Sequence, residues 1–450
     1  MKTKKVDFLI RYEHKVRDLE SIMLIRAELE RRGYSVAFIC NYEYNPQVRY
    51  QPKVLVSPAI YSDANLIGDF QNYGLLPKIV NLLWEQLIGI KDEESPNCSH
   101  NVVGTGQKAI TLCWGEQTQN RIVASGVPSK NAIVVGQLNL DLLKEPFNKT
   151  LLSKEELAER YNLDGSKKWL LFVSSFAYSE LDPIQIAGYI KDIGEEDLNY
   201  MINLSNKSRS EILKWFEIAL QKYPESIIIY RPHPDEARKS QVLKDMEAKY
   251  PNFRVISELA LKHWMNASDK VYNWYSTGLV DAKVLNKPIR LLRPCHIDRD
   301  FDYRIYLDAK KITTKNEFLA DFVNFEKQNI LDEDLFNSYY YIPKHFTYMK
   351  VCDILEDMLK TNKYDINYSL NEYIKFGSVI VKAKFIKCLK PFLPIMQMLP
   401  VLKGMVKKRL DKRDIVINTL KQGYDKNVAT EQDIQEIYQR VKPIIYGPKV

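Results

Sequence analysis

The sequence predicts an α/β fold made of two successive Rossmann-like domains followed by a basic helical extension. Short β-branched and apolar runs alternate with amphipathic helical stretches over the first 300 residues, which is the pattern of an open parallel sheet. The alternation starts afresh after an acidic helical stretch at residues 153–161. At 450 residues, the chain is also too long for a single core.

The first series of elements defines an N-terminal domain at residues 1–150. A buried strand is expected at residues 6–10, followed by a helix at 22–30 that ends near Gly33. Further strands are expected at residues 34–40, 53–56, 78–83, 109–113 and 131–136. Strand, helix and strand in this order form the βαβ unit of a parallel sheet.

The second series defines a domain at residues 151–350. Its expected strands lie at residues 169–173, 226–230, 253–256, 270–272 and 289–292, and its expected helices at 211–222, 239–248 and 279–285. Two Rossmann-like halves in one chain predict a ligand cleft between the domains, at the carboxyl ends of the strands.

Cysteine usage and apolar segments bear on the compartment. The six cysteines are scattered, with no Cys-x-x-Cys pair, which argues against a disulfide framework or a zinc site and for a reducing cytosol. No apolar window is long enough to span a bilayer, and the first apolar run is too short for a signal peptide. We therefore expect a cytoplasmic protein.

The strongest local signal is Arg231-Pro232-His233-Pro234, which directly follows an expected strand. The two prolines exclude a regular helix and fix the loop around His233. Arg231 and His233 can both donate to phosphate oxygens, so this loop is a candidate anion site. The alternative is a proline-rich surface turn with an incidental histidine.

A second signal is Ser276-Thr277-Gly278, between an expected strand and the helix at 279–285. A hydroxyl there can cap the helix, and the helix start offers free N–H groups to an anion. Helix capping alone would explain this pair. The earlier His-Pro loop favours a phosphate site. Ser174 and Ser175, just past the strand at 169–173, are further candidates for contacting donor phosphates.

These motifs together resemble the donor site of GT-B transferases that use cytidine nucleotides. Bacterial sialyltransferases and Kdo transferases are of this kind, and the teichoic-acid glycerophosphotransferases carry a similar Arg-Pro-His-Pro loop. Residues 13–20, 114–117, 126–128 and 134–141 resemble the corresponding stretches of those glycerophosphotransferases. The resemblance extends in patches over residues 5–300. It implies that His233, Ser276 and Thr277 contact the nucleotide phosphates. Glu236 would hold ribose hydroxyls or support His233.

The catalytic base is where the sequence departs from these relatives, because the acidic-acidic-Gly triplet of many sialyltransferases is absent. Glu13 or His14, in the first strand-to-helix loop, is the preferred base. A solvated helix start would explain the same residues equally well. Other candidates for the cleft are Arg17, Glu85 and Glu116. No metal is expected, because Asp298-Arg299-Asp300 is better explained as a charged loop.

A basic segment at residues 373–410 contains nine Lys or Arg residues and no acidic residue. Within a helical extension at 351–450, its lysines alternate with large apolar residues. This composition suits a helix on an anionic membrane surface. The expected membrane-contacting residues are Lys384, Phe385, Lys387, Lys390, Phe392, Lys407, Lys408 and Arg409. Packing on the chain's own body or on a partner is the alternative, and no nucleic acid is expected.

The combined reading is a glycosyltransferase that is peripheral at the inner face of the cell membrane. It would use a nucleotide-activated sugar, CMP-linked in this hypothesis, to build a capsule, lipopolysaccharide O-antigen or similar polysaccharide on a lipid-linked acceptor. The first alternative is a CDP-glycerol or ribitol-type polyol-phosphate transferase on the same fold. The second is a nucleotide-sugar epimerase or a non-catalytic assembly protein.

Overall fold

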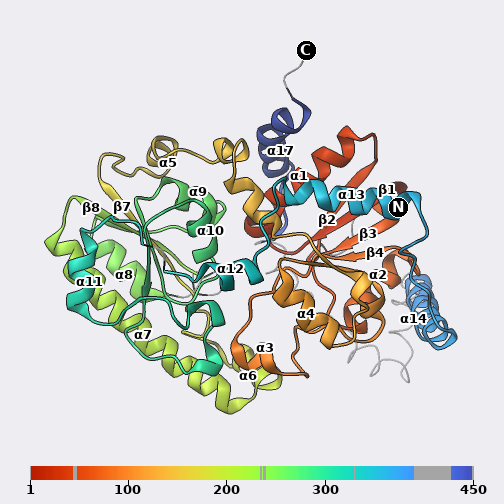
Figure 1. Cartoon of the computed structure of the whole chain (residues 1–450), viewed down its shortest axis with the longest axis horizontal. Coiled ribbons are helices and arrows are strands. Elements are labelled where there is room, and N and C mark those ends of the chain that lie inside the picture. Colours follow the sequence, from red (N-terminus) through yellow and green to blue (C-terminus); the bar gives the residue numbers. More distant parts are fainter. Residues whose placement is uncertain are drawn as a thin grey trace, which may run out of the picture. The chain divides into compact units, whose positions relative to one another are not determined.

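The computed structural model describes residues 2–43, 48–233, 236, 240–328, 330–389 and 427–447. These divide into two compact units (Figure 1). The first unit contains Met1–Gln86, Asp92–Asp141 and the described part of Asn337–Val450, and the second contains Leu87–Lys91 and Leu142–Phe336. Each unit is built on one parallel sheet, which confirms the predicted α/β fold of two Rossmann-like domains.

The sheet of the first unit has the strand order β2-β1-β3-β4-β5-β6. Its strands are β1 (Lys2–Tyr12), β2 (Val36–Cys40), β3 (Val48–Ser57), β4 (Ile79–Asn81), β5 (Ile110–Cys113) and β6 (Ala132–Val134). Every neighbouring pair is parallel. The direction of strand addition reverses between β1 and β3, and ligands of open α/β sheets bind beyond the carboxyl ends at such a reversal.

The helices of the first unit come from both ends of the chain. They are α1 (Lys15–Arg31), α2 (Asp63–Tyr73), α4 (Glu116–Ala124), α13 (Thr347–Lys360), α14 (Leu370–Leu389) and α17 (Glu431–Tyr446). Two further helices, α3 (Ile90–Glu94) and α12 (Glu333–Tyr339), each contain residues assigned to both units. The sequence predicts a separate extension from residue 351. In the structure, α13 and α17 pack on α1, and α14 packs on α2.

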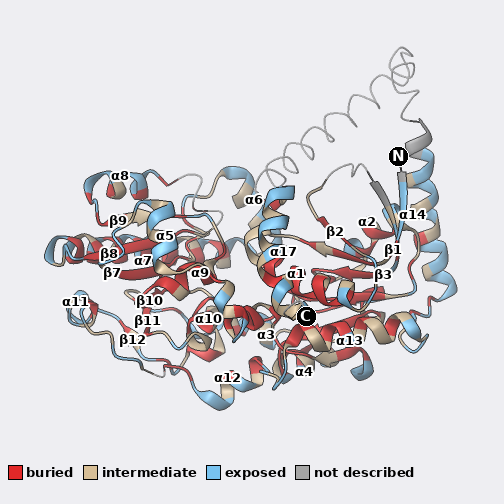
Figure 2. Ribbon diagram, turned by 90° about the horizontal axis from the view of Figure 1, so that it is seen from above, coloured by how far each residue is buried: buried red, intermediate tan, exposed pale blue. Residues whose placement is uncertain are grey.

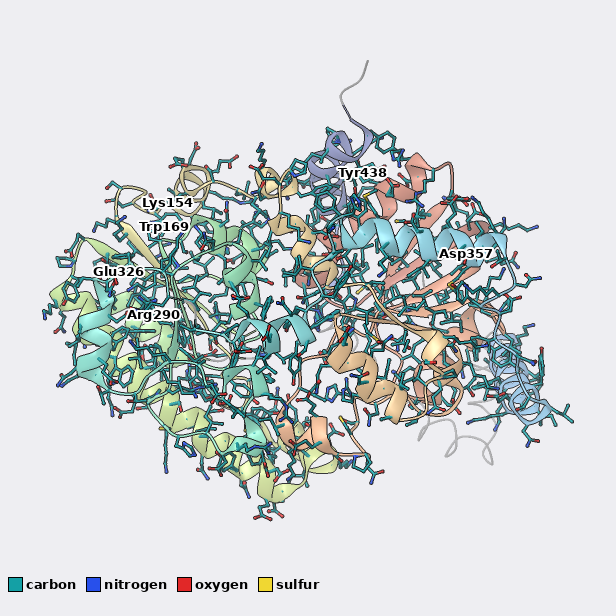
Figure 3. The ribbon with its side chains drawn as sticks, in the orientation of Figure 1. Lys154, Trp169, Arg290, Glu326, Asp357 and Tyr438 are labelled. Atoms are coloured by element: carbon teal, nitrogen blue, oxygen red, sulfur yellow. The ribbon has the colours of Figure 1, made fainter. Side chains whose placement is uncertain are left out.

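Helix α1 provides the surface on which the C-terminal helices α13 and α17 pack. Its residues are buried almost all round from Asp18 to Leu29, as expected for a helix enclosed on several sides. Arg26 lies between two rings, 5.1 Å from the centre of Phe38 and 4.5 Å from that of Tyr438. Tyr438, on α17, is labelled in Figure 3. These cation–π contacts fasten α17 to α1 and β2.

The sheet of the second unit has the strand order β12-β11-β10-β7-β8-β9. Its strands are β7 (Lys168–Val173), β8 (Ser226–Arg231), β9 (Phe253–Val255), β10 (Lys270–Asn273), β11 (Ile289–Leu292) and β12 (Lys311–Ile312). The first strand, β7, is central, and the direction of addition reverses between β7 and β10. This is the strand order of a dinucleotide-binding sheet.

The helices of the second unit are α5 (Lys154–Tyr161), α6 (Pro183–Ile193), α7 (Glu195–Lys222), α8 (Gln241–Lys249), α9 (Leu261–Ala267), α10 (Leu279–Val284) and α11 (Lys315–Phe322). Helix α7 is longer than the helix predicted at 211–222, because Leu198, Met201 and Leu204 continue its buried face among polar residues. Most strand residues of both sheets are buried (red in Figure 2), whereas one side of α14 is exposed.

Candidate functional site

Three neighbouring strands of the second unit end on a common row. Val173 of β7 pairs in register with Asn273 of β10 on one side and with Arg231 of β8 on the other. The predicted donor residues follow directly after these strand ends and therefore lie together at the carboxyl ends of the strands. They are Ser174 and Ser175 after β7, His233 after β8, and Ser276 and Thr277 after β10. We call this end of the sheet its carboxyl edge. It includes the point between β7 and β10 where the direction of strand addition reverses.

Glu236 stabilises the loop that carries His233. The Glu236 carboxylate accepts hydrogen bonds from the His233 backbone N–H (3.3 Å), the Tyr230 hydroxyl (2.6 Å) and the Ser174 hydroxyl. Its side chain has no exposed surface and lies 3.0 Å from Arg209 Nε. Burial raises the pKa of Glu236, and Arg209 opposes this rise. Of the two roles that the sequence left open, the geometry favours support of the His233 loop.

The side chain of Arg231 hydrogen-bonds to backbone carbonyls of its own unit. Its guanidinium donates to the carbonyls of Ile256 (3.2 Å), Glu258 and Leu259, in the loop that follows β9. The side chain is buried, and burial lowers the pKa of Arg231 to about 10. To bind a phosphate, the Arg231 guanidinium would have to give up these hydrogen bonds to the carbonyl oxygens. Pro234, the last residue of the motif, lies outside the described residues.

The turn at Ser276 is fixed by Asn273, a residue that the sequence analysis did not single out. The Asn273 side chain accepts from the Ser276 N–H (2.7 Å) and donates to the Ser276 carbonyl (2.5 Å). The Ser276 hydroxyl accepts from the N–H of Gly278 (3.1 Å), so it caps the turn just before α10. Thr277 is exposed. The buried Ser175 hydroxyl has no hydrogen-bond partner within the described part of the chain.

In the first unit, Asp18 holds the loop that carries both candidate bases. Asp18 is fully buried in the first turn of α1, and one of its carboxylate oxygens accepts from the backbone N–H groups of Glu13 (3.0 Å) and His14 (2.9 Å). The other oxygen accepts from Arg17 Nε (2.6 Å). Glu13 and His14 therefore lie at the carboxyl end of β1, at the strand reversal of this sheet.

Arg17 links several charged side chains of the first unit, which we call the Arg17 cluster: Glu13, Arg17, Asp18, Glu85 and His100. The guanidinium reaches Glu13 at 3.0 Å and Glu85 at 3.5 Å. Burial disfavours the charge of Arg17, but Asp18, Glu13 and Glu85 outweigh this effect and raise its pKa. Glu116, another candidate from the sequence, is exposed at the start of α4, and no described contact joins it to the cluster.

His100 joins the Arg17 cluster through Glu85, with 3.6 Å between Nε2 and the nearer carboxylate oxygen. Its ring packs edge-on against Tyr61, with 5.5 Å between ring centres. Burial disfavours the imidazolium, but Cys98 and Glu85 outweigh this and raise the pKa of His100 to about 9. The contact with His100 in turn lowers the pKa of Glu85. His100 lies in a loop with no recognisable motif, so it could not be predicted as a site residue.

A His100→Gln variant should lose stability in a pH-dependent way. The histidine pKa is about 6.5 in an unfolded chain and about 9 in the folded protein. Its stabilising effect is therefore complete below about pH 6.5 and disappears as the pH rises through about 9. Because Glu85 is half exposed, we expect screening to limit the loss to about 1–2 kcal/mol.

Urea unfolding of the wild type and the His100→Gln variant, compared at pH 6 and pH 10, measures this effect. The two proteins should differ at pH 6 and converge at pH 10. A difference that is equal at the two pH values would contradict the ion pair between His100 and Glu85.

The described part of the basic extension leaves Lys384 and Phe385 exposed on α14. The side chain of Lys387 and the whole of Lys390, Phe392, Lys407, Lys408 and Arg409 lie outside the described residues. Among the helices that the structure describes, none has the length and apolar character needed to cross a membrane. Within the same residues, no group of three or more His, Cys, Asp or Glu side chains is arranged to hold a metal ion.

Comparisons by sequence find no match, either to a protein-family model or to a curated protein. Among solved structures, the chain is similar to a histidine-to-alanine variant of the wall teichoic acid polymerase TagF, at 10% identity and a TM-score of 0.50, over 80% of this chain and 90% of that chain. A second TagF variant, soaked with CDPG, aligns at 11% identity and a TM-score of 0.50, over 79% of this chain and 89% of that chain.

The UDP-GlcNAc 2-epimerase of Methanocaldococcus jannaschii, in complex with UDP-GlcNAc and UDP, aligns at 12% identity and a TM-score of 0.49. That alignment covers 78% of this chain and 99% of the epimerase. At these identities, the likeness to the TagF structures shows the fold alone. The chain has the GT-B type of fold, with two Rossmann-like units.

Proposed function

We propose that the chain is a metal-independent glycosyltransferase that moves a sugar from a nucleotide-activated donor, CMP-linked in our hypothesis, to a lipid-linked acceptor of a bacterial surface polysaccharide. The observation that carries the proposal is the alignment of β10, β7 and β8, which places Ser175, His233 and Ser276 at one carboxyl edge. Backbone N–H groups, hydroxyls and an imidazole at a strand reversal suit the phosphates of a nucleotide.

The first unit would bind the acceptor and supply the base. A general base must reach the proton of the attacking hydroxyl, and Glu13 and His14 lie at the strand reversal where a ligand of this sheet would bind. Arg17 already pairs with the Glu13 carboxylate (3.0 Å), so the Glu13 side chain is engaged in an ion pair. We therefore favour His14 as the base.

A second candidate is transfer of a polyol phosphate from a CDP-linked donor. It is favoured by the likeness of fold to TagF, which is named as a wall teichoic acid polymerase and was soaked with CDPG. In that reaction, the acceptor hydroxyl attacks phosphorus, whereas glycosyl transfer takes place at an anomeric carbon. The same carboxyl edge would hold the nucleotide in either case.

The deciding experiment screens nucleotides and then donors. Thermal unfolding is measured with CMP, CDP, UDP and GDP, since a ligand of the folded state raises the apparent melting temperature. CMP-sugars and CDP-glycerol are then offered in parallel, with and without a lipid-linked acceptor, and with EDTA to test metal independence. Conversion of the donor alone would identify an epimerase. Failure to bind any nucleotide would indicate a non-catalytic assembly protein.

A His233→Ala variant is expected to bind the donor about 10- to 100-fold more weakly, because a charge-assisted hydrogen bond to phosphate is lost. Calorimetric titration of the preferred nucleotide measures the change. His296→Ala is the matched control, since His296 lies in the same unit with 87% of its side chain exposed. Equal affinity of the His233 and His296 variants would refute the donor site.

Association with an anionic membrane surface is part of the same proposal. It is supported by the basic composition of residues 373–410 and by the exposure of Lys384 and Phe385. Co-sedimentation with anionic vesicles, in parallel with neutral ones, tests it.

A further inference from the structure

His14 contacts a residue from the far end of the chain. Its Nδ1 atom lies 3.0 Å from the side-chain oxygen of Asn427, 413 positions later in the sequence. Asn427 is 4% exposed, and the region that includes it leads into α17. The sequence offered no reason to connect these two residues.

Asn427 is held by the same elements that carry His14. Its backbone carbonyl accepts from the Cys40 thiol at the end of β2 (3.6 Å). Two residues later, the N–H of Ala429 donates to the hydroxyl of Tyr12 at the end of β1 (2.9 Å). Asp433 then pairs with Lys15, the first residue of α1, at 2.8 Å. Asn427 is therefore fixed relative to the imidazole that it contacts.

This contact determines which nitrogen of His14 carries the proton. An amide oxygen only accepts hydrogen bonds, so Nδ1 must be the protonated nitrogen of the neutral ring. Nε2 then keeps its lone pair and can accept a proton. The Glu13 carboxylate is 3.8 Å from Nε2, which is too long for a hydrogen bond that would favour the other tautomer.

We propose that Asn427 is a positioning residue that fixes His14 in its Nδ1–H tautomer and thereby presents Nε2 as the proton acceptor. The catalytic part of this inference rests on the proposed function. The tautomer does not, because it follows from the contact between Asn427 and His14. The two can therefore be tested separately.

The direct test is NMR of the full chain labelled with ¹⁵N-histidine, using long-range correlations that distinguish protonated from bare ring nitrogens. His14→Gln identifies the His14 signals. In the wild type, at a pH where the ring is neutral, we expect a protonated Nδ1 and a bare Nε2. Asn427→Leu should give a mixture of tautomers, whereas Asn427→Asp keeps an accepting oxygen and should keep the Nδ1–H form. A wild-type Nε2–H tautomer overturns the proposal.

Kinetics test the positioning role. With the donor and acceptor identified above, Asn427→Leu should lower kcat about 10- to 100-fold and leave KM for the donor within about twofold, because only proton transfer is affected. Lys15→Ala is the matched control, since it removes another tie of the same segment without touching Asn427. Unchanged kcat in Asn427→Leu, or an equal loss in Lys15→Ala, overturns the role.

The possible failures are distinguishable. If no donor is turned over but the wild type shows the Nδ1–H tautomer, the proposed function fails and the structural inference stands. If Asn427→Leu does not fold, the tautomers of the wild type and of Asn427→Asp still decide the proposal.

Discussion

A His14→Gln variant is expected to lose about two to four orders of magnitude in kcat, which is the usual contribution of a general base. Glutamine retains polar contacts at this position but cannot take a proton from an acceptor hydroxyl. Donor affinity should stay unchanged, because the proposed donor residues belong to the other unit. Steady-state rates with saturating acceptor measure kcat, and calorimetry measures donor affinity.

Glu13→Gln is the matched comparison for this prediction. Glu13 precedes His14 in the same loop and shares the backbone support of Asp18, so the two variants disturb the same structure. If His14 is the base, Glu13→Gln should have much the smaller effect. A collapse of kcat in Glu13→Gln, with near-normal rates in His14→Gln, would transfer the role to Glu13.

The fold was predictable because parallel strands that are buried on both faces have short apolar runs as their sequences. The runs at residues 169–173 and 226–230 therefore predict β7 and β8 within one residue of their observed bounds. The strand order was not predictable, since the same runs are compatible with several orders. The docking of α13 and α17 on α1 was equally hidden, because an amphipathic face shows that a helix packs but not what it packs against.

The site was predictable where one motif carries the chemistry. His233 and Ser276 follow strand ends, and strand register brings them to one edge. For Glu236 the sequence left two roles open, and the structure favours the support of the His233 loop. The contacts of Arg231 were not predictable, because they depend on residues elsewhere in the chain. Arg231 looks like a phosphate ligand in the sequence, yet its donors meet the carbonyls at 256–259. The contact of His14 with Asn427 has no local signal at all.

The most destabilising substitution that we predict is Arg209→Leu in α7. Arg209 has only 6% of its side chain exposed and pairs with two carboxylates, Glu236 at 3.0 Å and Glu180 at 2.9 Å. Without it, no cation in the described part of the chain pairs with the buried Glu236. Removing one partner of a buried ion pair costs about 3–5 kcal/mol. Urea unfolding, followed by the fluorescence of the buried tryptophans of this unit, measures the loss.

The pH dependence and a double variant separate this mechanism from simple loss of packing. The pKa of Glu236 is already raised in the folded protein, and losing Arg209 should raise it further. A carboxyl whose folded pKa is raised destabilises increasingly as pH rises from its unfolded value, so the deficit should be larger at pH 8 than at pH 5. Arg209→Leu/Glu236→Leu should recover part of the loss, because the buried charge of Glu236 is removed and the remaining partner, Glu180, is 32% exposed. Lys214→Ala, which breaks an exposed pair on the same helix, should cost less than about 1 kcal/mol. If Arg209→Leu lowered the free energy of unfolding no more than Lys214→Ala, Glu236 would not depend on Arg209. The role assigned to Glu236 in supporting the His233 loop would then be refuted.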